Sequence, residues 1–134
     1  MFEFIKSIFG GSKPKVIDVK KINSGWFLKI LDGKDRNKVF SLDYSIVFIG
    51  RIDKNRKDDR KCSIRLDDQS ISFNQAHLVW KEDKLQYCLI HDKQPTINRT
   101  FVNDKNAEPG VEILLNEGDK IKAGRVEMVI TREN

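Results

Sequence analysis

The chain has 134 residues, which is enough for one domain with a hydrophobic core and too few for two domains of ordinary size. Hydrophobic residues make up 39% and charged residues 34%, and the apolar residues form short clusters, which excludes both a disordered tail and a membrane-spanning helix. The net charge of +5 suits nucleic acid, acidic lipid or phosphorylated protein, but aromatic residues do not alternate with Lys or Arg, so we expect no nucleic-acid binding.

Residues 1–15 predict an amphipathic helix followed by a linker. Met1, Phe4, Ile5 and Ile8 share one face of a helix over residues 1–9, and the glycine pair at 10–11 ends it. A helix of this length is marginal by itself. It therefore either packs as a strap on the protein's own core or docks weakly on a membrane or a protein complex.

Residues 16–134 predict a single all-β domain. Strands are expected at residues 26–30, 39–42, 45–49, 63–66, 76–80, 85–90, 111–115, 120–122 and 126–131, with turn residues between them. Short strands at regular spacing indicate an antiparallel β-sandwich, whose end loops are a natural place for a binding site. The expected core comprises Trp26, Phe27, Phe40, Phe48, Trp80 and Leu89.

The sequence offers no arrangement for catalysis or metal binding. It contains no nucleophile with an adjacent base, no convincing carboxylate pair and no glycine-rich phosphate loop. Cys62 and Cys88 are far apart and have no neighbours at metal-ligand spacing, which favours two reduced thiols. We therefore expect a protein that is not an enzyme and has no cofactor. The absence of a signal peptide predicts a cytoplasmic location, with membrane or complex association through the N-terminus. The oligomeric state stays undetermined.

Three polar loop residues are suited to holding a phosphate and the peptide that carries it. Arg51 follows Gly50 at the end of an apolar run, Ser72 precedes the next run, and Asn98 lies in a third loop. Arginine supplies a planar fork of donors that matches phosphate oxygens. Serine adds a hydroxyl, and an asparagine amide both donates to and accepts from a peptide main chain. Taken singly, each of these residues also fits an ordinary strand end or turn. The phosphate-binding interpretation therefore requires that the fold brings the three loops together.

Five motifs in order resemble the forkhead-associated (FHA) domain family. They are Ile49-Gly50-Arg51, the segment 64–72 (Ile-x-Leu-x-Asp-x-Ser-Ile-Ser), Ala76-x-Leu78, the turn 98–103 and the segment 115–124. The resemblance implies an eleven-stranded, FHA/SMAD-like sandwich that reads phosphothreonine in kinase-linked signalling or complex assembly. It also implies that Arg51 and Ser72 contact the phosphate and that Asn98 holds the peptide main chain. The only threonines are Thr96, Thr100 and Thr131, all within the domain, so the phosphorylated partner is expected in trans.

The chain departs from the family pattern at three places. Gln75 stands where the family usually has a loop-bracing histidine, and its amide can still donate and accept. Ile97 replaces a phosphate-contacting Ser or Thr, although Thr96 is adjacent. Arg99 replaces a turn glycine, which either changes the turn or costs about 1 kcal/mol. Thr96 and Arg99 are thus further candidates for phosphopeptide binding. The same departures motivate an alternative, a degenerate scaffold that binds its partner without phosphate.

The segment 52–61 is rich in both signs of charge, with basic residues in excess. Beside a phosphate site, such a segment either steers an acidic phosphopeptide or is a solvated hairpin loop.

Overall fold

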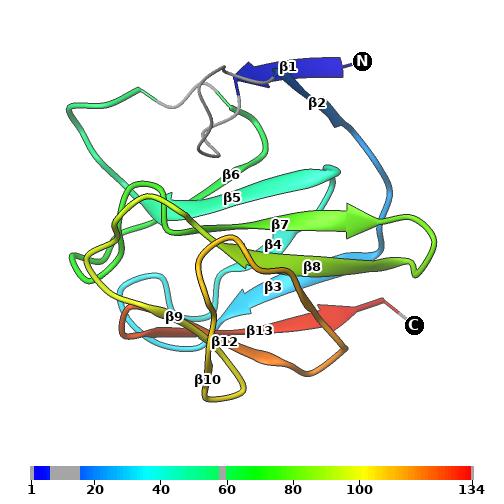
Figure 1. Ribbon diagram of the computed structural model, residues 1–134. Helices are drawn as coiled ribbons and strands as arrows, with labels where there is room; N and C mark the ends of the chain where they lie inside the picture. The colour runs from blue at the N-terminus through cyan, green and yellow to red at the C-terminus, as the bar shows by residue number, and fades with distance from the viewer. Residues whose placement is uncertain (1, 7–15, 58–59, 134) are drawn as a thin grey trace.

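The computed structural model describes residues 2–6, 16–57 and 60–133 and shows two β-sheets packed as layers (Figure 1). One sheet has six strands in the order β10-β9-β12-β13-β3-β4: β3 (Trp26–Ile30), β4 (Val39–Ser41), β9 (Thr100–Val102), β10 (Lys105–Asn106), β12 (Lys120–Ala123) and β13 (Val126–Arg132). The other has five in the order β11-β8-β7-β5-β6: β5 (Ile46–Arg51), β6 (Ser63–Leu66), β7 (Ala76–Lys81), β8 (Gln86–His91) and β11 (Ile113–Leu114). The prediction of a β-sandwich of short strands is confirmed.

Strand β6 runs parallel to β5, whereas the other pairings within the two sheets are antiparallel. Phe48 lies opposite Ser63, and Arg51 lies opposite Leu66. A parallel pair needs a connection that returns along the length of the strands. The segment between β5 and β6 is therefore a crossover, and its interpretation as a hairpin loop is wrong.

The core lies between the two sheets and includes two of the six residues expected there, Trp26 and Leu89. Phe40 and Trp80 are partly buried against it. Phe48 is buried instead in a second cluster with Val19, Ile46 and Cys62. Side chains alternate along a strand, so Phe48 points to the face of β5 opposite its core neighbours Val47 and Ile49. Phe27 lies outside the core for the same reason. It stands between the core residues Trp26 and Leu28 in β3, so its side chain points to the opposite face of the sheet.

Strand β1 (Phe2–Lys6) pairs with β2 (Val16–Lys20) as a two-stranded antiparallel sheet above β5 and β6 in Figure 1. Val19 is buried within the second cluster, so β2 covers the outer face of the five-stranded sheet. Of the helix expected over residues 1–9, residues 2–6 form strand β1 instead, and the remainder lies outside the described residues. A helix of nine residues is marginal by itself, whereas pairing with β2 provides the main chain of residues 2–6 with hydrogen bonds. The described residues contain no helix that is long and apolar enough to span a membrane.

The β9–β10 hairpin turns at Asn103 and Asp104, whose φ angles are +49° and +67°. Positive φ at both central residues is the geometry of a tight hairpin. The Asn103 side chain donates to Asp119 at 2.9 Å and accepts from the Lys120 N–H at 2.9 Å, which joins the hairpin to β12. This part of the family motif is thus structural.

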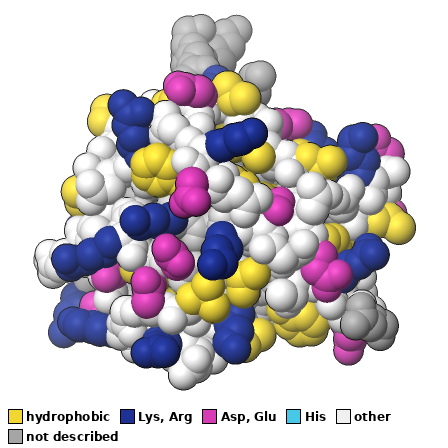
Figure 2. All heavy atoms as spheres, turned by 90° about the horizontal axis from the view of Figure 1, so that it is seen from below, with side chains coloured by type: hydrophobic (Ala, Val, Ile, Leu, Met, Phe, Trp, Pro, Cys, Tyr) yellow, Lys and Arg dark blue, Asp and Glu magenta, His cyan; other side chains and the backbone are white. Residues whose placement is uncertain are grey.

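Figure 2 shows the outer face of the six-stranded sheet, where basic and acidic side chains are intermixed. That face presents no uniformly basic surface to a polyanion.

Candidate functional site

Three connecting segments meet at one end of the sandwich, on the left of Figure 1. They are the segment after β5, the β6–β7 loop and the β8–β9 loop. Together they form a shallow hollow of about 260 Å³ lined by Arg51, Arg56, Ser72, Phe73, Asn74, Gln94, Pro95 and Ile97. The fold therefore brings Arg51 and Ser72 into one hollow, whereas Asn98, which follows Ile97, lines a neighbouring hollow that Ile97 also borders.

Arg51 reaches the hollow because the chain passes closely behind it at Gly50. A side chain on Gly50 would collide with the carbonyl of Phe73 and the guanidinium of Arg65, so only glycine fits there. The Arg51 N–H donates to the Ser72 carbonyl at 3.0 Å, which fastens the end of β5 to the β6–β7 loop. The half-buried Arg51 side chain forms no ion pair with any residue in the described part of the chain. Its donors are available to a ligand.

The Ser72 hydroxyl lines the hollow and keeps its proton for donation. Its oxygen accepts the Ile97 N–H at 2.6 Å, so the hydroxyl proton points elsewhere. The preceding residue, Ile71, is completely buried in the core and anchors the loop. Ser72 itself is only 9% exposed, which holds its side chain in place.

Gln75 is completely buried and connects two of the three segments. Its carbonyl oxygen accepts the Ser72 N–H at 2.9 Å. Its amide nitrogen donates to the Asn98 carbonyl at 3.0 Å and to the Thr100 hydroxyl at 2.9 Å. One amide thus satisfies main-chain groups on both sides of the hollow, and its two ends match the donor and the acceptors that they face.

His91, at the end of β8, extends this network. Its Nδ1 lies 2.8 Å from the Thr100 hydroxyl, and its Nε2 lies 3.1 Å from the Thr96 hydroxyl. Thr96 also donates to the Asn98 carbonyl at 2.8 Å, so its oxygen accepts from Nε2–H. When the ring is neutral, Nδ1 accepts from the Thr100 hydroxyl. Burial lowers the pKa of His91, an effect that Asp92 opposes and Arg99 adds to.

Asn98 has an exposed side chain whose Nδ2 donates to the Ser70 carbonyl at 3.0 Å. Ser70 is held in turn by Asp68, whose Oδ1 accepts the Ser70 hydroxyl at 2.6 Å and N–H at 2.8 Å. Burial by itself would raise the pKa of Asp68, but these hydrogen bonds and the Arg125 guanidinium hold it below its ordinary value. The Asn98 amide is thereby oriented, while its Oδ1 has no hydrogen-bond partner among the described residues.

Thr96 and Arg99 line a neighbouring hollow of about 520 Å³, not the one that contains Arg51 and Ser72. Ile97 borders both and is 59% exposed. Thr96 uses its hydroxyl internally, in the network with His91. Arg99 does not have a positive φ, so the turn has a shape that needs no glycine and carries no such strain.

Sequence reasoning missed the contributions of His91 and Phe73 to this site. His91 is one of only two histidines in the chain and ends a strand, but its partners lie five and nine residues further on, in an irregular loop. Phe73 directly follows Ser72, and its ring stacks with arginines from two other segments. Neither set of partners has a recognisable spacing.

The FHA domain family model matches residues 47–124 of the chain. Among solved structures, the FHA domain of a Chlamydia trachomatis protein is 20% identical with a TM-score of 0.63, covering 81% of this chain and 98% of its own. The FHA domain of an Arabidopsis thaliana hypothetical protein is 20% identical with a TM-score of 0.66, covering 92% and 96%. A structure from a study of phosphothreonine-dependent FHA domain interactions is 24% identical with a TM-score of 0.60, covering 81% and 97%. No curated protein matches the chain.

Proposed function

This chain belongs to the FHA domain family, and on that premise we propose that it is a binding module for phosphothreonine in a partner protein. The partner binds in trans, in kinase-linked signalling or in the assembly of a protein complex. In this proposal Arg51 and Ser72 bind the phosphate, and Asn98 binds the main chain of the peptide. The module carries out no reaction of its own.

The observation that carries the proposal is the pairing of Arg51 with Ser72 in one hollow. The Arg51 guanidinium has no internal ion pair in the described ranges, and the Ser72 hydroxyl has its acceptor side occupied by the Ile97 N–H. A phosphothreonine brings a charge of about −2 and three acceptor oxygens. Two parallel donors from arginine and one from serine complement those oxygens. Asn98 then lies where its free Oδ1 can accept a peptide N–H.

The proposal is tested by fluorescence polarisation with a degenerate phosphothreonine peptide library, beside unphosphorylated and phosphoserine libraries. Hydrogen bonds to charged groups contribute about 1.5–3 kcal/mol each, so Arg51→Ala should weaken phosphothreonine binding at least about a hundredfold. Arg36→Ala is the matched control, because it removes the same charge from an exposed residue outside the hollow. Binding of equal strength to phosphorylated and unphosphorylated libraries would reject the proposal.

That outcome would favour the alternative, a scaffold that binds a partner without phosphate. The observation in its favour is Ile97, whose apolar side chain is exposed at the rim where a hydroxyl would assist phosphate binding. Under this alternative, Ile97→Ser would weaken partner binding. Under the phosphothreonine proposal, the same change would leave binding unaltered or strengthen it.

We further propose that the protein acts in the cytoplasm, where its N-terminal segment brings the module to a membrane or a complex. Deleting residues 1–11 should then redistribute a fluorescent fusion in cells. An unchanged distribution would remove this part of the proposal.

A further inference from the structure

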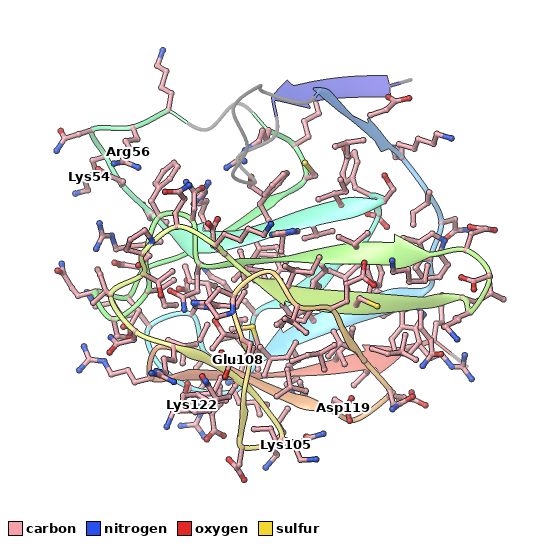
Figure 3. All side chains as sticks on the ribbon, viewed as in Figure 1. Lys54, Arg56, Lys105, Glu108, Asp119 and Lys122 are labelled. Atoms are coloured by element: carbon pink, nitrogen blue, oxygen red, sulfur yellow. The ribbon has the colours of Figure 1, made fainter. Side chains whose placement is uncertain are left out.

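We propose that Arg56 provides a second guanidinium for the bound phosphate, taking over the contact that is absent at Ile97. The inference rests on the proposed function and adds a residue to the same site. Figure 3 shows Arg56 on the crossover segment between β5 and β6, at the end of the sandwich where the three segments meet. Arg56 lines the same hollow as Arg51 and Ser72.

A compact turn holds Arg56 in this place. The Arg56 N–H donates to the Asp53 carbonyl at 3.1 Å, and the Asn55 N–H donates to the Asp53 carboxylate at 2.9 Å. The Asp53 carboxylate also lies 3.6 Å from Nε of Arg56. Such turns, in which an aspartate caps the chain two residues later, hold the backbone in one conformation. This part of the crossover is therefore ordered locally.

The Phe73 ring provides the platform on which the Arg56 side chain lies. The central carbon of the guanidinium is 4.7 Å from the ring centroid. Stacking uses the flat face of a guanidinium, whereas its N–H donors lie in its plane. A guanidinium lying over the ring therefore keeps its in-plane N–H donors for other partners. Since Phe73 follows Ser72 directly, the platform is part of the phosphate-binding loop itself.

Arg65 stacks on the same ring at 3.9 Å but has a different role. Its guanidinium donates to the carbonyls of Phe73 and Arg51, the latter at 3.5 Å. Its Nη1 is directed to the backbone, and Arg65 does not line the hollow. Arg65 therefore supports the loop, while Arg51 and Arg56 face the ligand.

Charge balance agrees with two arginines at this site. A phosphothreonine carries a charge of about −2. Arg51 brings one positive charge, and Ser72 brings a neutral donor. Ile97 adds no side-chain donor and is 59% exposed. Arg56 brings a second positive charge, and its side chain, also 59% exposed, can exchange the long contact with Asp53 for phosphate oxygens.

The test compares Arg56→Ala with Lys57→Ala, using the fluorescein-labelled degenerate phosphothreonine library as the probe. Lys57 is the neighbouring exposed cation and does not line the hollow, so its removal measures long-range steering alone. We expect Arg56→Ala to weaken binding about tenfold, mainly through faster dissociation, and Lys57→Ala to change it less than about twofold. Arg56→Lys should bind severalfold more weakly than wild type, because an ammonium provides no planar fork.

Equal effects of Arg56→Ala and Lys57→Ala would overturn the inference, since only steering would then remain. Full affinity in Arg56→Lys would overturn the stacked geometry. The two failures are distinguishable from failure of the proposed function. If wild type binds the library and Arg51→Ala does not, while Arg56→Ala equals wild type, only this inference fails. If wild type shows no phosphate dependence, both fail.

A second measurement tests the platform. In a double-mutant cycle, Phe73→Leu and Arg56→Ala should be strongly non-additive, because each removes the same stacked contact. Circular dichroism melting of each variant confirms that it is folded. Additive losses in folded variants would show that Arg56 acts without the ring.

Discussion

Replacing Gln75 with leucine removes three hydrogen bonds while keeping a side chain of similar size in a completely buried position. The Ser72 N–H loses its acceptor and leucine provides no substitute, while the Thr100 hydroxyl and Asn98 carbonyl each keep another partner. At about 1 kcal/mol for each bond, the free energy of unfolding should fall by about 3 kcal/mol. The melting temperature should fall by roughly 10 °C.

Denaturant unfolding followed by tryptophan fluorescence measures this loss. Gln86→Leu is the control, because the Gln86 amide also donates two hydrogen bonds, to the Leu115 carbonyl at 3.0 Å and Asn116 at 2.9 Å, but from a less buried position. We expect it to cost about 1 kcal/mol or less. Gln75→Leu should also weaken phosphopeptide binding under conditions where it is fully folded, and Gln86→Leu should not. If Gln75→Leu changes the unfolding free energy by less than 0.5 kcal/mol, the bridging amide does not hold these loops together.

Gly50→Ala should destabilise the domain by roughly 2–3 kcal/mol in denaturant unfolding, since the added methyl meets the Phe73 carbonyl and the Arg65 guanidinium; an alanine variant as stable as wild type would contradict this packing. Burial lowers the pKa of His77 from 6.5 to about 4. The unfolded chain therefore binds the proton first, so stability is fully present above pH 6.5 and declines by up to about 3 kcal/mol as the pH falls to 4. His77→Phe should flatten that decline in unfolding measured at successive pH values, and an unchanged profile would assign acid lability to other groups. Asn98→Ala should leave the melting temperature within about 3 °C of wild type, because the side chain is exposed, yet weaken phosphothreonine binding about tenfold. A folded variant that binds the phosphothreonine library as strongly as wild type would contradict this role.

The strand pattern and the family were readable from the sequence because both depend on local features. Alternation of apolar residues reveals which runs form strands, as in β3 and β13, and turn residues mark their ends. Where alternation was not followed through, the core prediction was wrong, as for Phe27, while Phe48 is buried as predicted but in the second cluster. Pairing partners were not readable, so the parallel β5–β6 pair appeared to be a hairpin.

The sequence by itself determined the class of fold, the family and the identity of Arg51, Ser72 and Asn98 as candidates, because each sits in a short motif whose spacing reflects local backbone requirements. Tertiary structure alone decided what surrounds them. Gln75 meets Asn98 and Thr100, residues 23 and 25 positions away, and Arg56 meets a ring on another loop. Hydrogen bonding and stacking require proximity in space, and at such separations only the packing of the two sheets determines which side chains become neighbours.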